Sequence, residues 1–363
     1  MNKLVNMHQN NNMKKNFYEY FIPIIILCII SILSIHNSKS IISNYNDYLI
    51  KQIIFIIIGT ILLFIFRKIN YNYIKKYILI FYFISILLLI YVLIFGKTIN
   101  GSKSWINILG FSFQPSEFTK ISLLICIDKY IKTKYGLLKS IILLIIPTVL
   151  TFMQPDTGTV LFYLIIFFSI FISIGLNKKY YIGLFSIVII FIITYFYLYF
   201  FESDLFIKLL GTSFFYRTDR IINFVNSSGY QLNNALISIG NGGILGNQSK
   251  YVIYIPESIT DFMFASVLTI FGLLGGIITL MLFFVLDIKL IKDIKQTNKH
   301  KYFVIGLIGL FLYQQIEHIG MNIGLLPITG ITLPFISYGG SSLISYFILF
   351  GILLNIKKYQ SDT

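Results

Sequence analysis

Long runs of apolar residues, separated by short polar segments, dominate the chain. A helix needs about 17–25 mostly apolar residues to cross the roughly 30 Å hydrocarbon core of a bilayer. The stretches that approach or reach this length cover residues 18–36, 48–66, 74–96, 116–132, 138–153, 158–176, 180–201, 262–286, 302–324 and 335–356. Backbone polar groups in lipid must be paired within the protein, which favours helices. The pattern predicts an all-α, polytopic integral membrane helix bundle with about ten transmembrane helices.

Positive charges predict which side of the membrane each polar segment faces, because Lys and Arg collect on the cytoplasmic side. If the tail at residues 1–17 is cytoplasmic, twenty Lys and Arg side chains fall on the inner side and eight on the outer side. Both termini are then cytoplasmic. The first apolar stretch lacks a small-residue cleavage site, so we expect a retained helix and not a removed signal peptide.

The polar segment at residues 202–260 stands out by its length. It falls on the outer side, between the seventh and eighth apolar stretches, and it is too long for a plain connector, so we expect a large extracytoplasmic functional loop. Five of the seven prolines also fall at predicted outer helix ends, namely Pro115, Pro155, Pro256, Pro327 and Pro334. Residues 1–363 are therefore predicted to form one transmembrane domain whose chemistry lies at the outer face.

Composition supports the membrane class and excludes other classes. The chain has 363 residues, 56% hydrophobic and 12% charged, with a mean hydropathy of +0.81, far from the values of a soluble domain. It is rich in Ile, Lys, Asn and Tyr, so its net charge of +15 partly reflects biased composition and does not indicate a nucleic-acid partner. Cys28 and Cys126 lie inside apolar runs, and the histidines lack metal-ligand spacing, so we expect no disulfide, zinc or haem.

The first candidate cluster is Gly101-Ser-Lys-Ser-Trp-Ile-Asn followed by Phe113-Gln-Pro-Ser-Glu-Phe-Thr-Lys120. Glu117 and Lys120 lie three residues apart and share a helix face, so a local ion pair is the plain structural interpretation. Lys120 nevertheless lies inside an apolar span, where a charge is costly and usually functional. The same cluster supplies two further candidates for substrate binding, Lys103 and Trp105.

Two more clusters lie on the predicted outer face. Asp156 occupies a short turn, Gln154-Pro-Asp-Thr-Gly-Thr, where it could support the chemistry or simply cap the next helix. Arg217 and Arg220 are two of only three arginines, and helical spacing would place both guanidinium groups on one face. Arginine suits bidentate contacts with phosphate oxygens. A structural salt bridge with Asp219 is the alternative.

The fourth cluster is Pro256-Glu-Ser-Ile-Thr-Asp-Phe, directly before the eighth apolar stretch. Glu257 and Asp261 lie four apart, so both carboxylates could face one way at a helix mouth, and one could act as a general base. Helix capping is the alternative. Glu317 and His318 lie within an apolar span and are either functional or paired. The Gly-rich run at residues 238–246 lacks the strand–helix context of a nucleotide site, so we expect no nucleotide.

These clusters, in this order, resemble the SEDS family (shape, elongation, division and sporulation), the group that contains RodA and FtsW. The matching pieces are Trp105-Ile, Phe113-Gln-Pro-Ser-Glu117, Gln154-Pro-Asp156-x-Gly-Thr, Ile239-Gly-x-Gly-Gly, Pro256-Glu-x-x-Thr-Asp261-Phe and the long, highly specific run GMNIGLLPITGITLPFISYGGSS at residues 320–342. The short tails and the Asn-Ile-Gly-Leu-Leu-Pro segment favour the RodA-like elongation branch over the division branch.

The resemblance implies a peptidoglycan glycosyltransferase in the bacterial cytoplasmic (inner) membrane. Such an enzyme joins lipid II units through β-1,4 bonds and releases undecaprenyl diphosphate. The family works with a class B penicillin-binding protein, which supplies transpeptidation, and we expect other elongation-machinery membrane proteins as further partners. The catalytic acid of the family corresponds to Asp261 in this chain.

The chemistry of that transfer fits the candidate residues. A base must take the proton of the acceptor hydroxyl, and cations must hold the departing diphosphate. Asp261 suits the first role, with Glu257 and Asp156 as supporting acids, and a Mg²⁺ or Mn²⁺ ion bound at Asp261 and Glu257 could share the second role. The candidate substrate-binding residues are Lys103, Trp105, Glu117, Lys120, Arg217 and Arg220. A division-type paralogue, a lipid-precursor flippase or transporter, and a non-catalytic scaffold are the alternatives.

Overall fold

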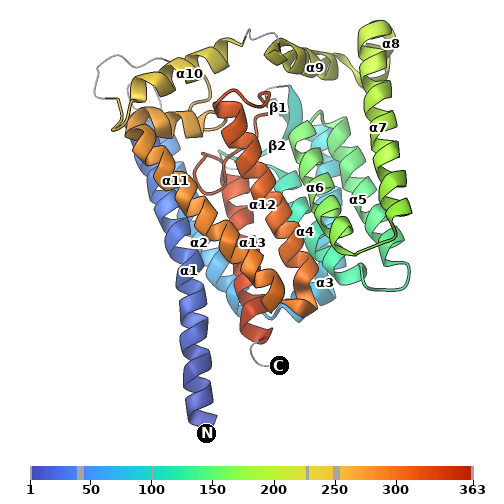
Figure 1. The fold of residues 1–363 in the computed structure, drawn as a ribbon. Helices are drawn as coiled ribbons and strands as arrows, with labels where there is room; N and C mark the ends of the chain where they lie inside the picture. Colours follow the sequence, from blue (N-terminus) through green and yellow to red (C-terminus); the bar gives the residue numbers. More distant parts are fainter. Residues whose placement is uncertain are drawn as a thin grey trace.

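The computed structural model describes residues 2–38, 45–99, 101–108, 110–225, 229–247 and 254–360. The description excludes the side chains of residues 2–14, 213, 217, 220, 221, 223–225, 359 and 360. Figure 1 shows a bundle of long helices. The helices are α1 (Asn2–Asn37), α2 (Tyr45–Lys68), α3 (Tyr71–Phe95), α4 (Pro115–Tyr130), α5 (Gly136–Met153), α6 (Thr157–Ser173), α7 (Lys178–Phe201), α8 (Ser203–Leu210), α9 (Thr212–Val225), α10 (Tyr230–Gly242), α11 (Met263–Gln296), α12 (Lys301–Asn322) and α13 (Gly340–Gln360).

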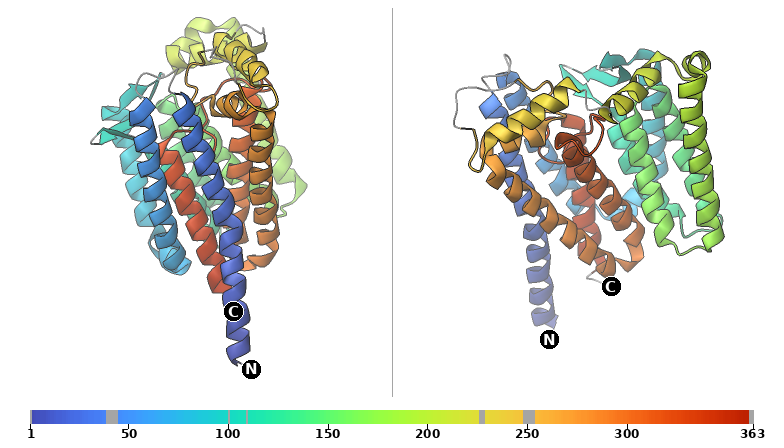
Figure 2. Two further views of the ribbon diagram at one scale, coloured as in Figure 1. Left: turned by 90° about the vertical axis from the view of Figure 1, so that its left-hand side faces the viewer. Right: turned by 45° about the horizontal axis from the view of Figure 1, so that its top comes forward.

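The two ends of the bundle differ in chemistry. α1 begins and α13 ends at one end, which we call the termini end (Figures 1 and 2). The end of α2 at Lys68, the connection with Lys132 and the start of α7 at Lys178 lie there too. α8, α9 and α10 lie across the opposite end, where α11 begins, and we call this the Asp261 end. The basic residues therefore gather at the end predicted to be cytoplasmic, while the orientation in the membrane stays a prediction.

Eight helices in the described part of the chain are long and apolar enough to cross a membrane: α1 from Lys15, α2, α3, α5, α7, α11, α12 and α13. α6 is apolar but shorter. α4 has 16 residues, of which four are charged, namely Glu117, Lys120, Asp128 and Lys129. Each predicted apolar stretch coincides with a helix, but the number of helices that span the membrane stays a prediction.

The segment at residues 202–260, which we predicted as a loop, contains three helices, α8, α9 and α10. α8 packs Phe206 inward, whereas Leu205 and Leu209 are exposed. The ring of Phe206 is fully buried beside Tyr195 and Tyr199 of α7 and Phe215 of α9. A helix with one apolar face and one polar face is typical of a protein surface. The apolar positions of such helices are too few and too spaced to stand out in a search for runs of membrane length.

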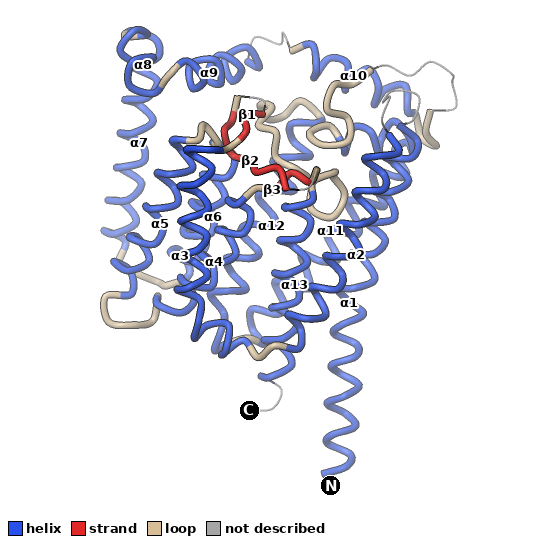
Figure 3. The backbone as a smooth tube through the Cα atoms, turned by 180° about the vertical axis from the view of Figure 1, so that it is seen from behind, coloured by secondary structure: helices blue, strands red, loops and turns tan. Residues whose placement is uncertain are grey.

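A small antiparallel sheet corrects the all-α prediction. Its strands are β1 (Lys97–Ile99), β2 (Ser102–Ile108) and β3 (Phe111–Phe113), in the order β1-β2-β3. The sequence Asn100-Gly101 is the dipeptide most typical of two-residue hairpin loops, and Gly101 has the positive φ of 78° that such a turn needs. Figure 3 shows the strands at the Asp261 end. Their alternation of polar and apolar residues is short and stands between much longer apolar runs.

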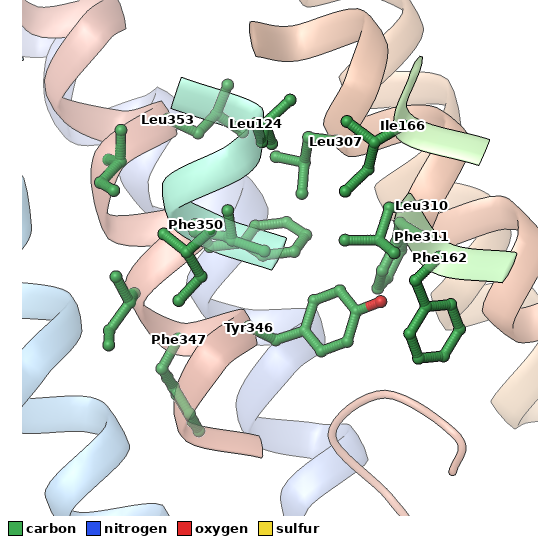
Figure 4. Close-up of a cluster of buried hydrophobic side chains, with 14 of the residues drawn as sticks. Leu124, Phe162, Ile166, Leu307, Leu310, Phe311, Tyr346, Phe347, Phe350 and Leu353 are labelled. Carbon is green, nitrogen blue, oxygen red and sulfur yellow. The ribbon is translucent and has the colours of Figure 1, made fainter. Parts of the chain in front are cut away.

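α13 lies at the centre of the bundle and α7 at its edge. The apolar window of α13 is 83% buried, whereas that of α7 is 0% buried, so we expect lipid around α7. Figure 4 shows part of the core, where side chains from α4, α6, α12 and α13 meet. Leu124, Phe162, Leu310 and Phe350 come from these four helices in turn, and each is at most 3% exposed. The buried charged residues of α4, namely Glu117, Lys120 and Asp128, must therefore be paired inside the protein.

The Gly-rich run of the sequence ends against a break in α11. Gly272 has a φ of 67°, outside the helical range, and separates the first turns of α11 from the rest. The turn after α10 satisfies the backbone there: Leu273 N donates to Gly243 O (2.9 Å), and Asn247 N donates to Thr269 O (2.8 Å). A Cβ on Gly246 would lie 2.1 Å from the Ile270 oxygen, so only glycine fits. The run thus serves backbone packing.

Two buried carboxylates join helices at the termini end. Asp128 of α4 forms a salt bridge with Lys75 of α3 (2.9 Å) and accepts from the hydroxyl of Tyr71 (3.0 Å). Asp293 of α11 forms a salt bridge with Lys357 of α13 (2.7 Å). We assigned both lysines to membrane topology from the sequence, and the structure shows that they also neutralise buried acids.

Candidate functional site

Asp261 lies in the connection between α10 and α11, in a series of turns at residues 256–262. α11 begins two residues later at Met263, with Phe262 at the N-cap position. The amides of Thr260 and Phe262 both donate to the Glu257 oxygen, at 3.2 and 3.0 Å. Asp261 therefore belongs to a hydrogen-bonded turn, and the helical spacing from which we paired it with Glu257 does not apply.

Glu257 shapes this turn. It has a positive φ of 54°, which is costly for a residue with a side chain. Its Oε2 atom accepts a hydrogen bond from the Thr260 hydroxyl at 2.9 Å. This bond ties the exposed Glu257 carboxylate to its own turn. Glu257 thus fixes the backbone on both sides of Asp261 through its bonds with Thr260 and Phe262.

The carboxylate of Asp261 lies against the backbone of Gly330, in the connection between α12 and α13. A Cβ on Gly330 would lie 3.4 Å from Oδ2 of Asp261, and the φ of Gly330 is +76°. Asp261 itself is half-buried. A glycine at this position leaves room beside the carboxylate that a side chain would fill. The site is therefore built from two connections, the one that precedes α11 and the one that follows α12.

Hydrogen bonds join the two connections directly. Tyr338 N donates to Ile259 O (2.8 Å), and the Ser337 hydroxyl donates to Thr260 O (2.8 Å). The long run at residues 320–342 thus packs beside the Pro256-Glu-x-x-Thr-Asp-Phe segment. Ser337 and Thr260 are 77 residues apart in the sequence, so the spacing of motifs alone could not reveal this contact.

Glu117 and Lys120 form the ion pair that their spacing predicted. The pair is buried, with side-chain exposures of 4% and 0%. The ammonium also lies over the rings of Tyr346 and Phe162, at 4.6 and 5.1 Å from their centroids, and the Ser345 hydroxyl donates to Glu117 at 2.9 Å. Figure 4 shows Tyr346 facing Phe162 in this part of the core. The Lys120 ammonium therefore contacts one carboxylate and two aromatic rings of the protein. Its role in binding diphosphate stays a prediction.

A polar path leads from this pair toward the Asp261 end. The Tyr346 hydroxyl donates to the amide oxygen of Gln314 on α12. Gln314 in turn donates to the Thr332 oxygen at 2.7 Å, and Thr332 donates to the Ser342 hydroxyl at 3.0 Å. Thr332 lies two residues after Gly330. Gln314 was absent from our sequence-based candidates, although a buried amide in an apolar span was a signal that could have identified it.

Asp156 and Lys103 have structural partners. Asp156 caps α6 by accepting from Thr159 N (3.3 Å), as the plain interpretation predicted, and it also accepts from the Gln114 side chain (2.8 Å). The ammonium of Lys103 donates to the Ile94 oxygen in the last turn of α3 (2.8 Å). Trp105 is half-buried on β2. Direct roles of these three residues at the substrate stay predictions.

Arg217 and Arg220 lie on α9, which confirms the helical segment that their pairing required. Their side chains lie outside the described part of the structure. Asp219, the alternative salt-bridge partner, accepts a hydrogen bond from the Tyr199 hydroxyl of α7. α9 lies across the Asp261 end (Figure 1), so the backbone places both arginines on the same end of the bundle as Asp261.

The described residues contain no group of three or more His, Cys, Asp and Glu side chains that could hold a metal ion. Asp261 and Glu257 provide two carboxylates, and one Glu257 oxygen already accepts from Thr260. Mg²⁺ is often held by one or two carboxylates together with substrate phosphates and water. These residues therefore fit a metal ion only where a diphosphate supplies further oxygen ligands.

Fold and site together define a polytopic membrane protein whose polar loops gather at one end of an apolar helix bundle. Residues 15–362 match the protein-family model for FtsW, RodA and SpoVE, described as cell cycle protein. The chain belongs to this family, the SEDS family. Family membership and the apolar helices fit a protein of the bacterial inner membrane.

Curated relatives carry an enzyme name. The chain is 36% identical over 319 residues to the probable peptidoglycan glycosyltransferase FtsW of Wigglesworthia glossinidia brevipalpis, and the match covers 79% of each chain. It is 32% identical over 311 residues to stage V sporulation protein E of Bacillus subtilis (strain 168), which covers 76% of this chain and 78% of that one. The relatives named FtsW confirm the predicted enzyme class, peptidoglycan glycosyltransferase, but not the RodA branch.

Solved structures share the fold. A chain of the structure described as "Structural coordination of polymerization and crosslinking by a peptidoglycan synthase complex" matches with a TM-score of 0.75 and 24% identity, over 94% of this chain and 98% of that one. Rod shape determining protein RodA of Thermus thermophilus matches with a TM-score of 0.67 and 23% identity, over 93% and 95%. This chain therefore has the same fold as these two solved chains.

Proposed function

We propose that this protein polymerises lipid II into β-1,4-linked glycan strands and releases undecaprenyl diphosphate, with Asp261 as the general base. The main support for this proposal is the position of Asp261. The residue is half-buried in a turn fixed by backbone hydrogen bonds, and its carboxylate lies beside Gly330. A base must be placed within hydrogen-bond reach of the proton that it removes, and a turn fixed in this way meets that need. The family membership supplies the reaction class.

The transfer can be written with its atoms and electrons in balance. The acceptor sugar hydroxyl gives its proton to the Asp261 carboxylate as its oxygen bonds to the anomeric carbon of the donor. The bond between that carbon and the diphosphate oxygen breaks, and its electron pair leaves with the diphosphate. Cations near the leaving group stabilise the charge that develops. We assign that role first to Arg217 and Arg220, because the backbone of α9 places them at the Asp261 end.

The other candidate substrate-binding residues have supporting roles in this proposal. They are Lys103, Lys120, Trp105 and Glu117. The Lys120 ammonium is fully buried and paired with Glu117, so it acts through the electrostatic field of the core and not as an open anion site. Lys103 and Trp105 lie on β2. Lys103 N donates to the Gln154 oxygen (3.1 Å), which joins β2 to the turn before Asp156. A Mg²⁺ or Mn²⁺ ion held by Asp261 and Glu257 would withdraw charge from the departing diphosphate.

The active site is proposed to face the extracytoplasmic side. This orientation is supported by the gathering of Lys and Arg at the termini end, since positive charge favours the cytoplasmic side. Both termini are then cytoplasmic, and α8, α9 and α10 lie at the outer surface. A lipid-linked donor could reach Asp261 from the outer leaflet without crossing the bundle.

The relatives named FtsW favour the division role, which was our alternative, over the elongation role that the short tails predicted. The two roles predict different rescue in a host depleted of its own division or elongation polymerase. Restored septation without restored rod shape would assign this protein to division, and the reverse result would assign it to elongation. In either role, we propose a class B penicillin-binding protein as partner, since the structural neighbour with a TM-score of 0.75 belongs to a peptidoglycan synthase complex.

Polymerisation of purified lipid II, with and without a candidate class B penicillin-binding protein, tests the function. Asp261→Asn keeps size but cannot accept the proton, so the rate should fall by about 10²-fold or more. Glu257→Gln keeps an acceptor for Thr260 and should cost less. Asp204→Asn is the matched control, because Asp204 is an exposed acid in the first turn of α8. Near-normal polymer from Asp261→Asn would overturn the assignment.

A further inference from the structure

The first turn of α11, directly after Asp261, takes its capping groups from another helix. The first amides of any helix lack partners within that helix. The N-cap residue of α11 is Phe262, whose side chain cannot accept a hydrogen bond. Acceptors for these amides must therefore come from elsewhere in the protein, because this part of the chain is buried.

Two side chains of α12 supply the acceptors. Ala265 N donates to Oδ1 of Asn322 at 2.8 Å, and Phe264 N donates to Nε2 of His318 at 3.4 Å. His318 and Asn322 lie four residues apart on α12, so both face α11. Each is 0% exposed, so water does not compete for these bonds.

The same two side chains also contact the Asp261 backbone and the loop beside the Asp261 carboxylate. Nδ2 of Asn322 donates to the Asp261 backbone oxygen at 2.9 Å. Nδ1 of His318 lies 2.7 Å from the Ile331 oxygen, and Ile331 follows Gly330, against which the Asp261 carboxylate lies. One neutral tautomer satisfies both contacts, with the proton on Nδ1 donated to Ile331 and Nε2 accepting from Phe264.

We propose that His318 and Asn322 are positioning residues that fix Asp261 relative to Gly330. Asn322 holds the Asp261 main chain, and His318 joins the first turn of α11 to the loop that backs the carboxylate. The inference rests on the proposed function, because it gives Asp261 the role of the base. It goes further by assigning the placement of that base to two buried side chains of a different helix.

Removal of either side chain should slow the chemical step without changing substrate affinity. His318→Phe keeps a ring of similar size but loses both hydrogen bonds, and Asn322→Leu loses all three polar contacts of the amide. A small displacement of a reacting group costs on the order of 10²-fold in rate. We therefore expect kcat for lipid II polymerisation to fall by about that factor while KM stays unchanged.

Gln315→Met is the matched control. Gln315 is also a buried amide on α12, but it donates to Asp287 of α11 (3.1 Å), away from Asp261. This variant should lower thermal stability in detergent and leave kcat unchanged. If Asn322→Leu fails to accumulate in the membrane, Asn322→Asp retains the acceptor for Ala265 and loses only the donor to the Asp261 and His318 oxygens, so its kcat should fall as well.

The decisive measurement combines His318→Phe with Asp261→Asn. If His318 acts through Asp261, its replacement should not lower the residual rate of the Asp261→Asn protein any further. An additional loss equal to that in the wild-type background would show a general structural role and overturn the inference. Unchanged kcat in the His318 and Asn322 variants, alongside an inactive Asp261→Asn, would also overturn it. Full activity of Asp261→Asn would instead reject the proposed function.

Discussion

Gly246 and Gly272 meet backbone to backbone, and a Cβ on Gly272 would lie 2.3 Å from the Gly246 nitrogen. This contact joins the turn after α10 to the break in α11. The short segment of α11 between the break and Phe262 follows Asp261 directly. The turn after α10, at the surface of the Asp261 end, is thereby joined by backbone hydrogen bonds to the segment that directly follows the proposed base.

Gly272→Ala should destabilise the protein strongly. The added methyl group would overlap the Gly246 nitrogen, and alanine disfavours the observed φ of 67°. We expect a cost of roughly 2–4 kcal/mol, typical of overpacking combined with backbone strain. Thermal unfolding in detergent would measure it.

Gly183→Ala provides the control for this prediction. Gly183 is on α7, and a Cβ there would meet nothing within 4 Å. In a helix interior, alanine is favoured over glycine by about 1 kcal/mol, so this variant should be neutral or slightly stabilised. Equal melting temperatures for the two variants would contradict the assigned contact at Gly272.

Lys120→Met should separate structure from catalysis at the buried ion pair. Loss of one partner leaves the Glu117 carboxylate uncompensated in the core, which typically costs about 3–5 kcal/mol. Replacement of both residues, Glu117→Gln with Lys120→Met, should restore much of the stability. If the Lys120 charge also assists departure of the diphosphate, the double variant will be stable yet slow in lipid II polymerisation. Full activity of the stable double variant would leave the pair with a structural role alone.

Apolar run length predicted where the helices lie, because the bilayer sets that length directly. The Glu117–Lys120 pair was also predictable, since an i, i+3 spacing on a helix brings the two side chains together. α8, α9 and α10 were missed because amphipathic helices at a surface do not form apolar runs. Gly101 carried a turn signal for the β1–β2 hairpin, but the strands are only three to seven residues long.

The remaining contacts of the site depend on packing between distant segments. Asp261 and Asn322 are 61 residues apart, and His318 contacts Phe264 across 54 residues. At the termini end, Tyr20 donates to Asp293 across 273 residues. No local pattern specifies which buried donor meets which acceptor, since this follows from how the helices pack. The sequence therefore identified Asp261 as a candidate but not the residues that hold it.

Cysteine labelling can test the orientation of the bundle. In a background with Cys28 and Cys126 replaced by serine, a single cysteine at Tyr230 on α10 should react with an impermeant thiol reagent in intact cells. Tyr230 is 67% exposed at the Asp261 end, which we propose to be extracytoplasmic. A cysteine at Lys134, exposed between α4 and α5 at the termini end, should react only after lysis. The opposite pattern would reverse the proposed topology.

Arg217 and Arg220 should matter for use of the lipid-linked donor. The two arginines lie three residues apart on α9, so their backbone positions fall on one face of the helix. Arginine presents a planar fork of donors that matches phosphate oxygens, whereas lysine offers a compact charge. Arg217→Lys and Arg220→Lys therefore keep charge but lose bidentate contacts, and each should weaken lipid II polymerisation by about tenfold, which corresponds to roughly 1.4 kcal/mol.

The comparison with alanine variants separates charge from geometry. Arg217→Ala and Arg220→Ala should lose more activity than the lysine variants, because they remove the charge as well as the fork. Lys208→Ala, at the end of the neighbouring helix α8, is a control for the general loss of positive charge at this surface. Rates would be measured on purified protein at two salt concentrations, since exposed charge contacts weaken as ionic strength rises. Unchanged kinetics in both the lysine and alanine variants would return the arginines to a structural role, and the donor diphosphate would then have to be held by other groups at the Asp261 end.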